Sequence, residues 1–168
     1  MRPGRQPKPH SHCANARTLA ASANESTSYK SKMNPTLRNI VETTFKDITE
    51  KFDLHLEDKS KHWEFIELYN DNCIVRFIDD FGSIEVSFVN PSERQAAEKV
   101  IREDNFPTSY PIYPLYFVWE SLYPDDKINF RTSSWDKTEQ VLASKRLITE
   151  RLENVIKGDF SWTQSLKK

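Results

Sequence analysis

Hydrophobic positions near the start of the ordered part of the chain follow a helical spacing. Between residues 35 and 52, six apolar residues recur every three or four positions, which places them on one face of a helix. They are Leu37, Ile40, Val41, Phe45, Ile48 and Phe52. Asn34 and Pro35 precede them, and these residue types favour a helix start because Asn caps the first amides and Pro suits the first turn. We predict a first helix over residues 35–52.

The pattern then changes to one typical of strands. The segments 62–69, 73–79 and 83–90 are rich in β-branched and aromatic residues. They are separated by Asn70-Asp71-Asn72 and by Asp80-Phe81-Gly82, which suit short hairpin turns. The sequence therefore predicts an antiparallel meander of three strands, with a fourth short strand at residues 54–57.

The third strand shows the clearest alternation. Ile84, Val86 and Phe88 alternate with Glu85 and Ser87, as in a strand with one buried face. In the second strand, Cys73, Val75 and Phe77 share one face, and the other face is mixed: Ile74, Arg76 and Ile78.

The C-terminal half predicts further helices. Asn90-Pro91-Ser92-Glu93 resembles a capping box and favours a short helix over residues 91–103. The apolar run 112–119, interrupted by Pro114, fits either a helix to residue 122 or a buried strand, and we favour the helix. A long helix is expected over residues 136–157, with Asp136 as its cap and Gly158 as its stop. After it, Phe160 and Trp162 are expected to dock on the domain.

These elements predict the fold class. A sheet with an apolar face needs a cover, and the first and last helices supply it. We expect an α+β protein in which an antiparallel meander of three to four strands is covered by N-terminal and C-terminal helices, as a two-layer sandwich.

Composition divides the chain into two parts. Residues 1–32 carry six basic residues, one acidic residue and a single aromatic residue, whereas the other 136 residues carry 18 basic and 24 acidic residues. The first part cannot offset its chain entropy by burial, so we expect 1–32 to be a disordered basic extension and 33–168 to be one domain. Three interpretations of the extension remain open: a reading frame that starts too early, with Met33 as the true start; a transit peptide; or a genuine extension.

Several function classes find no support in the sequence. No apolar run is long enough for a transmembrane helix, and three glycines are too few for a phosphate-binding loop. His55, His62 and Cys73 lack the spacing of a metal site, and no nucleophile elbow surrounds Cys73. Basic residues in 33–168 are scattered, unlike a nucleic-acid interface. We therefore expect no cofactor, no metal, no nucleic acid, no membrane and no catalysis, and a cytoplasmic location.

Acidic residues gather where loops are predicted. Asp71 lies in the first hairpin turn, Asp79 and Asp80 end the second strand, and Asp125 and Asp126 follow the helix at 114–122. Such residues serve solubility and turn formation, or they form a surface that attracts a basic protein partner. On the second interpretation these five aspartates are the candidate partner-binding residues.

Aromatic residues are concentrated between Tyr110 and Tyr123. The segment fits a buried core, and it also fits an exposed interface patch, because Tyr and Trp are favoured in interfaces. The sequence does not decide between burial and exposure here.

Three segments together are similar to those of a group of small bacterial proteins. They are VRFIDDFGSIEVSF (75–88), YPLYFVWESLYP (113–124) and VIKGDFSWTQSL (155–166). The chain resembles, over most of 33–166, small uncharacterised bacterial proteins that are often interpreted as immunity proteins of polymorphic toxin systems. The resemblance implies a toxin as the partner, and it carries over no catalytic residue.

The expected function is a protein-binding domain that neutralises a toxin through its acidic loops. The alternative is a structural or regulatory domain that associates with itself through the aromatic segment. An enzyme with a site near His55 or His62 is a third hypothesis. The sequence does not predict the oligomeric state.

Overall fold

The computed structural model describes residues 36–59, 65–102, 111–126, 128 and 136–167. All described elements belong to one compact unit, residues 34–168. The expected basic extension 1–32 and the expected cap Asn34 lie outside the described residues, as do His62 and Tyr110.

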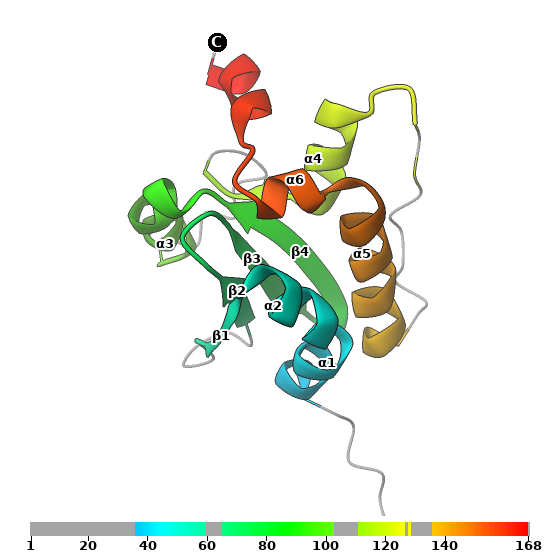
Figure 1. The fold of residues 1–168 in the computed structure, drawn as a ribbon. Coiled ribbons are helices and arrows are strands. Elements are labelled where there is room, and N and C mark those ends of the chain that lie inside the picture. Colours follow the sequence, from blue (N-terminus) through cyan, green and yellow to red (C-terminus); the bar gives the residue numbers. More distant parts are fainter. Residues whose placement is uncertain (1–35, 60–64, 103–110, 127, 129–135, 168) are drawn as a thin grey trace, which may run out of the picture. The chain divides into compact units, whose positions relative to one another are not determined.

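The centre of this unit is an antiparallel sheet of five strands in chain order (Figure 1). The strands are β1 (His55–Asp58), β2 (Phe65–Tyr69), β3 (Ile74–Asp80), β4 (Ser83–Val89) and β5 (Tyr113–Pro114). The predicted three-strand meander and the short strand near residues 54–57 are therefore confirmed. The two-residue strand β5, which pairs with Ser87 and Phe88 of β4, was not predicted.

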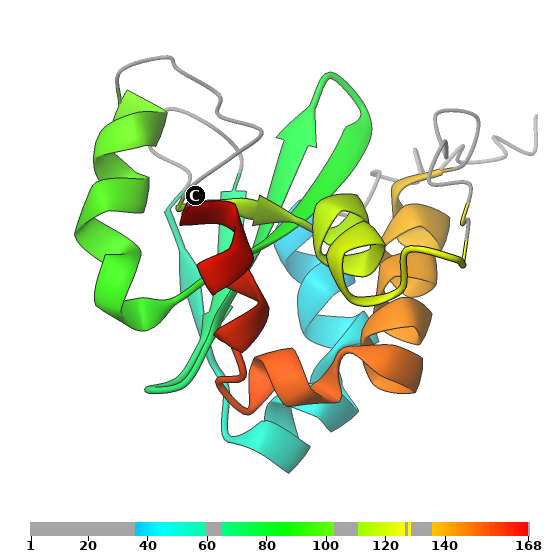
Figure 2. The ribbon, with the colours of Figure 1, turned by 90° about the horizontal axis from the view of Figure 1, so that it is seen from above.

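One face of the sheet carries the main core. Its alternating residues, among them Val75, Phe77 and Val86, pack against α1 (Leu37–Thr44), α2 (Lys46–Phe52) and α5 (Lys137–Arg151). Figure 2 shows these three helices together on one side of the sheet. The α+β class and the cover by N-terminal and C-terminal helices are confirmed.

The opposite face of the sheet is also partly covered. The 3-10 turn η1 (Pro91–Glu93) leads into α3 (Arg94–Arg102), which lies on the other side of the sheet from α1 and α5 (Figure 2). Ala97 of α3 belongs to a small second core with Ile74, Val89 and Ile112. This cover explains why the mixed face of β3, with Ile74, Arg76 and Ile78, is buried.

The predicted first helix is two helices. The chain leaves helical geometry at Phe45, whose side chain is fully buried and meets the Phe77 ring edge-on at 5.0 Å. The bend lets both short helices follow the sheet. The first helix begins at Leu37, and its cap is Thr36, whose side chain accepts a hydrogen bond from the Asn39 amide at 3.3 Å.

The last long helix is interrupted in a similar way. It consists of α5 and α6 (Glu153–Ile156), with a break at the buried residue Leu152. Asp136 caps α5 as predicted, since its carboxylate accepts the Glu139 amide at 2.9 Å. Gly158 stops the helical region with a φ of +95°.

The segment after Pro114 is the helix α4 (Leu115–Leu122), as favoured by the sequence. The predicted docking of the C-terminal segment is also confirmed. Phe160 is buried, and Trp162, in the 3-10 segment η2 (Ser161–Lys167), meets the Tyr113 ring edge-on at 5.0 Å.

Candidate functional site

The outer edge of β4 is only partly paired. Strand β5 covers Ser87 and Phe88, and the chain then leaves the sheet because Pro114 begins α4. Within the described part of the chain, no strand pairs with the outer edge of Ser83–Val86. An unpaired edge presents backbone donors and acceptors to whatever lies beside it.

The hairpin register decides which backbone groups face outward. Asp80 and Ser83 flank a two-residue turn, so they pair with each other and direct their backbone groups inward. The same alternation directs Glu85 inward, and Ile84 and Val86 outward. Gln140 of α5 confirms this pattern, because its side-chain oxygen accepts the Ile84 amide at 2.7 Å. Its side-chain nitrogen donates to the Gly82 carbonyl at 3.0 Å.

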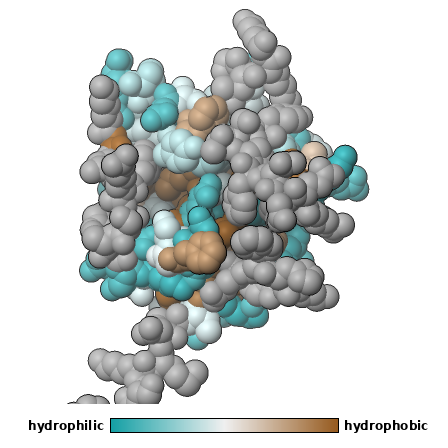
Figure 3. Space-filling model, turned by 180° about the vertical axis from the view of Figure 1, so that it is seen from behind, coloured by the Kyte–Doolittle hydropathy of each residue, from teal (hydrophilic) through white to brown (hydrophobic). Residues whose placement is uncertain are grey.

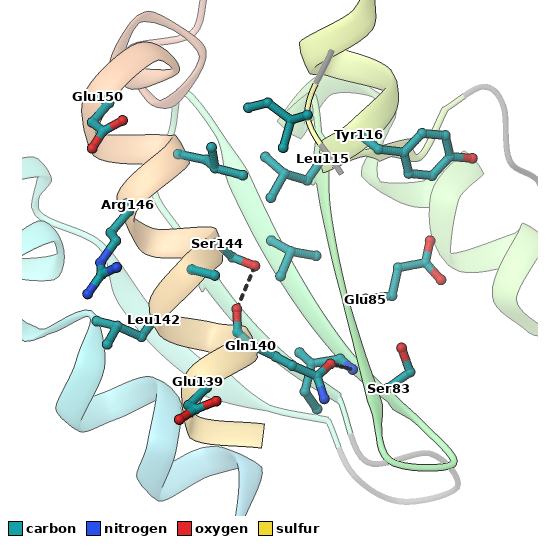
Figure 4. Close-up of a pocket in the computed structure, with 15 residues that line it drawn as sticks. Ser83, Glu85, Leu115, Tyr116, Glu139, Gln140, Leu142, Ser144, Arg146 and Glu150 are labelled. Carbon is teal, nitrogen blue, oxygen red and sulfur yellow. Dashed lines mark hydrogen bonds between the residues drawn. The ribbon is translucent and has the colours of Figure 1, made fainter. Parts of the chain in front are cut away.

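A groove of about 690 Å³ lies along this edge, between α4 and α5 (Figure 4). We call it the β4 groove. Its described lining residues are Ser83, Ile84, Glu85, Val86, Leu115, Tyr116, Ile128, Glu139, Gln140, Leu142, Ala143, Ser144, Arg146, Leu147 and Glu150. Its volume is within the usual range of ligand sites, roughly 300–1,000 Å³.

The two sides of the β4 edge differ in chemistry. Ile84, Val86 and Leu115 belong to the main core cluster, on the side of α5. Glu85 and Tyr116 point to the other side of the strand, away from α5 (Figure 4). The β4 residues are therefore aliphatic on the side of α5 and polar on the other side, and α5 itself adds the polar side chains of Glu139, Arg146 and Glu150 to the groove.

The charges around the groove are mainly negative. Among the described residues, Glu85, Glu139 and Glu150 line it, against one cation, Arg146. Burial raises the pKa of the Glu85 carboxyl, and the nearby Asp80 carboxylate raises it further. Burial also raises the pKa of the Tyr116 hydroxyl, with contributions from Glu85 and Glu120. A positive group placed here would relieve this crowding of negative charge.

The tip of the β3–β4 hairpin carries an exposed aromatic residue in an unusual conformation. Phe81 has a φ of +49°, followed by Gly82 with +94°, as in a type I′ turn. The Phe81 side chain is fully exposed, whereas Asn, Asp or Gly is preferred at such a position. Tyr116 and Leu142, which line the β4 groove, are the other exposed large hydrophobic residues of the described chain.

Two of the predicted partner-binding aspartates lie next to the groove. Asp79 and Asp80 end β3, beside Ser83 and Glu85. Asp79 is engaged in the fold: its carboxylate accepts the Gly82 amide at 2.8 Å and pairs with Lys137 of α5. Asp80 remains exposed.

The other three predicted aspartates lie elsewhere. Asp71 sits in the β2–β3 turn, at the far end of β3 from Asp79, so the length of β3 separates them by about 20 Å. Asp125 and Asp126 follow α4, and the Asp126 carbonyl accepts a hydrogen bond from the Trp119 indole of that helix at 2.9 Å. All three are exposed. Asp71 thus lies apart from Asp79 and Asp80, and the role of the five aspartates in binding stays a prediction.

A group of charged side chains is buried under α3, and we call it the Glu67 cluster. Glu67 is fully buried, and its two oxygens accept hydrogen bonds from Arg76 at 2.9 Å and from Arg94 at 2.8 Å. Lys59 lies 3.1 Å from Glu67, and Glu57 and Glu98 balance the remaining positive charge. The Arg76 Nη1 and Ser87 Oγ atoms are buried and find no hydrogen-bond partner among the described residues. Glu57, Glu67, Arg76 and Ser87 stand opposite one another across four strands, so the cluster joins the sheet to α3.

The residues considered for catalysis and metal binding are placed as follows. Cys73 is fully buried in the core, and burial raises the pKa of its thiol far above the ordinary value. Among the described residues, no group of three His, Cys, Asp or Glu side chains is arranged to hold a metal ion. None of the helices in the described ranges is long and apolar enough to cross a membrane.

The β4 groove was not predicted from the sequence. One signal was available, because Pro114 inside an aromatic run ends a strand and starts a helix. That signal does not tell which strand edge is left open. The pairing of Tyr113 with Phe88 locates both the end of β5 and the part of the β4 edge that lies beyond it.

Comparisons with known proteins give no family or relative. No family model, no curated protein and no solved structure matches the chain.

Proposed function

We propose that this chain is a protein-binding domain that takes a basic partner in the β4 groove. The observation that carries the proposal is the groove itself, whose described lining includes the carboxylates of Glu85, Glu139 and Glu150.

The charges favour a basic partner over an acidic one. Three carboxylates and one guanidinium are among the described lining of the groove, and Asp80 and Glu120 add negative charge nearby. Residues 33–168 carry 24 acidic against 18 basic residues, so the field around the domain has the same sign. Such a field speeds the encounter with a positively charged partner and disfavours a negative one.

The apolar surface supports recognition by a few residues rather than by a broad patch. On the face seen from behind, the coloured residues show apolar groups in small patches between hydrophilic ones (Figure 3). Tyr116 and Leu142 provide exposed apolar contacts on the groove itself, with 36% and 38% of their surface accessible. Aromatic and aliphatic anchors surrounded by polar groups are typical of binding hot spots.

Toxin neutralisation is one form that this function takes. An immunity protein blocks its toxin by covering a surface, which needs no chemistry in the domain itself. A toxin with a positively charged surface would fit the β4 groove and Asp80. Contacts with Asp71, Asp125 and Asp126 would require a partner that reaches around the domain.

The proposal is tested by selecting binders and mapping where they bind. A displayed library of random 12-residue peptides is selected on the full chain, and the affinities of the selected peptides are measured by fluorescence anisotropy. We expect peptides rich in Lys and Arg. Their affinity should fall about tenfold in the triple variant Glu85→Gln, Glu139→Gln and Glu150→Gln, because three charges that line the groove are lost.

A control variant removes the same number of charges far from the groove. It combines Glu42→Gln on α1, Glu50→Gln on α2 and Asp53→Asn just after α2, all three exposed. This variant should bind the selected peptides as the wild type does. Equal losses in both variants, or a selection without groove-dependent binders, would overturn the proposal.

A further inference from the structure

The tip of the β3–β4 hairpin presents an aromatic ring to solvent. The Phe81 side chain is fully exposed, so the ring packs against no other part of the described chain. The space beside it is open as well, since a β-carbon added to Gly82 would meet no atom within 4 Å, its two chain neighbours aside. A partner can therefore reach the ring from outside the domain.

The backbone at Phe81 adopts a conformation that bulky residues avoid. Its φ is +49°, and a large side chain in this left-handed region is a clear exception. Asn, Asp or Gly would suit the first central position of a type I′ turn. Phe81 thus adds both backbone strain and apolar exposure to the hairpin, and neither serves folding. Strain of this kind is found preferentially at functional sites.

Contacts from the hairpin and from α5 hold the tip in place. The Asp79 carboxylate accepts the Gly82 amide at 2.8 Å, and the Gln140 side-chain nitrogen donates to the Gly82 carbonyl at 3.0 Å. Lys137 of α5 in turn pairs with Asp79. The backbone that carries Phe81 is therefore fixed on both sides of Gly82. A ring presented in this way loses little conformational freedom when it binds, which favours affinity.

The charge beside the ring is negative. Asp80 precedes Phe81 and is exposed, and its carboxylate is close enough to Glu85 for the two charges to interact. A partner with positive charge around the ring would therefore be attracted. A second copy of this chain would bring the same acidic tip and is disfavoured. A lipid surface is disfavoured too, because anionic headgroups would meet these carboxylates.

We propose that Phe81 is the anchor of an interaction surface and enters an apolar pocket, bordered by Lys or Arg, on a protein partner. Aromatic residues that fill a pocket are typical binding hot spots. Asp80 lies next to the ring in sequence and meets the basic border of that pocket. This inference goes beyond the proposed function, because Phe81 is not among the described residues that line the β4 groove.

The test selects folded binders, since a short peptide offers no pocket. A displayed library of a three-helix domain with randomised surface positions is selected on the full chain, and affinities are measured by biolayer interferometry. We expect most selected domains to bind the variant Phe81→Asn at least tenfold more weakly. Because Asn suits the turn, this variant should unfold at no lower temperature than the wild type. Phe81→Tyr keeps the ring and should bind within about twofold of the wild type.

A matched pair of charge variants tests the basic border of the pocket. Asp80→Asn should weaken the selected domains severalfold and reduce the dependence of their affinity on salt. Asp53→Asn removes an equal charge from an exposed position just after α2, where the left-handed backbone also suits Asn. This control should bind as the wild type does.

The outcomes separate this inference from the proposed function. If the selected domains bind Phe81→Asn as tightly as the wild type, the anchor is wrong, while peptides that depend on the groove acids still support the proposed function. If the domains depend on Phe81 and no peptide depends on the groove, only the proposed function fails.

Two further measurements decide between the possible occupants of the tip. Sedimentation that shows a dimer for the wild type and a monomer for Phe81→Asn would assign the ring to a second copy and overturn the inference. Co-sedimentation of the wild type, but not of Phe81→Asn, with phosphatidylcholine–phosphatidylserine vesicles would assign it to a lipid surface, with the same consequence.

Discussion

At the scale of single residues, the Glu67 cluster is the feature with the largest energetic consequence. Arg76 and Glu67 are both fully shielded from water and are hydrogen-bonded to each other. Buried charges are tolerated only when they are paired and hydrogen-bonded, since desolvation of an unpaired ion costs several kcal/mol. The stability of the domain therefore depends on Glu67 more than on any exposed carboxylate.

Replacing Glu67 tests this dependence. Glu67→Gln keeps the shape and leaves Arg76 without a counter-charge, so we expect the free energy of unfolding to fall by about 3 kcal/mol. Urea unfolding followed by tryptophan fluorescence measures the change. The double variant Glu67→Leu, Arg76→Leu should lose less than the single variant, because no charge remains buried and unpaired. The exposed control Glu42→Gln should unfold at the wild-type urea midpoint. If Glu67→Gln also unfolds at that midpoint, the hypothesis is wrong.

Several of these residue roles were predictable, and others were not. Asp136 as a helix cap and Gly158 as a helix stop follow from local backbone chemistry, and both are confirmed. Arg76 appeared only as part of a mixed strand face, because burial by α3 is a tertiary event that its neighbours in sequence do not encode. Asp79 looked like a binding residue, yet it pairs with Lys137, which is 58 residues away.

At the scale of elements, the β3–β4 hairpin is regular everywhere except at its tip. Seven cross-strand pairs link the two strands, and Asp79 closes the turn through the Gly82 amide. Phe81 adopts the left-handed region with a bulky side chain in solvent. Strain of this kind is tolerated where the surrounding structure determines the conformation, and it is found preferentially at functional sites.

Relieving this strain should stabilise the hairpin. Phe81→Asn fits the type I′ turn, so we expect the free energy of unfolding to rise by about 1 kcal/mol. Thermal unfolding by circular dichroism measures the change, and Phe81→Ala, which keeps a left-handed residue with a β-carbon, should not share the gain. A loss of stability in Phe81→Asn would show that the aromatic ring makes stabilising contacts.

The helices show why periodicity predicts the type of an element better than its ends. The apolar spacing correctly gave helical residues on both sides of Phe45 and of Leu152. Neither break contains Gly or Pro, so no local signal marks it. Each break follows from fitting a helix to the sheet, which the spacing alone does not describe.

At the scale of the whole molecule, the C-terminal segment completes the core. Phe160 belongs to the main core cluster, and Trp162 packs against it. Both rings lie near Tyr113, at centroid distances of 6.3 Å and 5.0 Å. The residues after α6 therefore support β5, which in turn marks where the paired part of the β4 edge begins.

A matched pair of phenylalanines tests this contribution. Phe160→Ala should lower the free energy of unfolding by about 3 kcal/mol, because a buried aromatic ring is removed. Phe81→Ala removes the same atoms from a fully exposed position and should change it by less than about 0.5 kcal/mol. Urea unfolding compares the two variants, and equal effects would contradict a structural role of the C-terminal segment.

The fold class was predictable at this scale and the candidate site was not. The spacing of apolar residues shows which face of each strand and helix is apolar. Because these faces must be buried against each other, the spacing predicts the two-layer arrangement. The β4 groove exists because a strand stops after Pro114, and an uncovered edge has no sequence pattern of its own. The aspartates were predicted from their loops, whereas the groove acids Glu139 and Glu150 stand on a helix.

The Glu67 cluster, which extends across the sheet, also affects the register in which β2 and β3 pair. A slip of β2 against β3 by two residues keeps every side chain on its proper face, so packing of aliphatic groups discriminates poorly against it. In the slipped sheet, Arg76 would face Phe65 or Tyr69 instead of Glu67. The resulting buried, unpaired charges make misaligned sheets costly by several kcal/mol. The Glu67–Arg76 pair therefore favours the correct register of β2 and β3 during folding. We expect that, in natural variants of this protein, a substitution at Glu67 is accompanied by a substitution at Arg76.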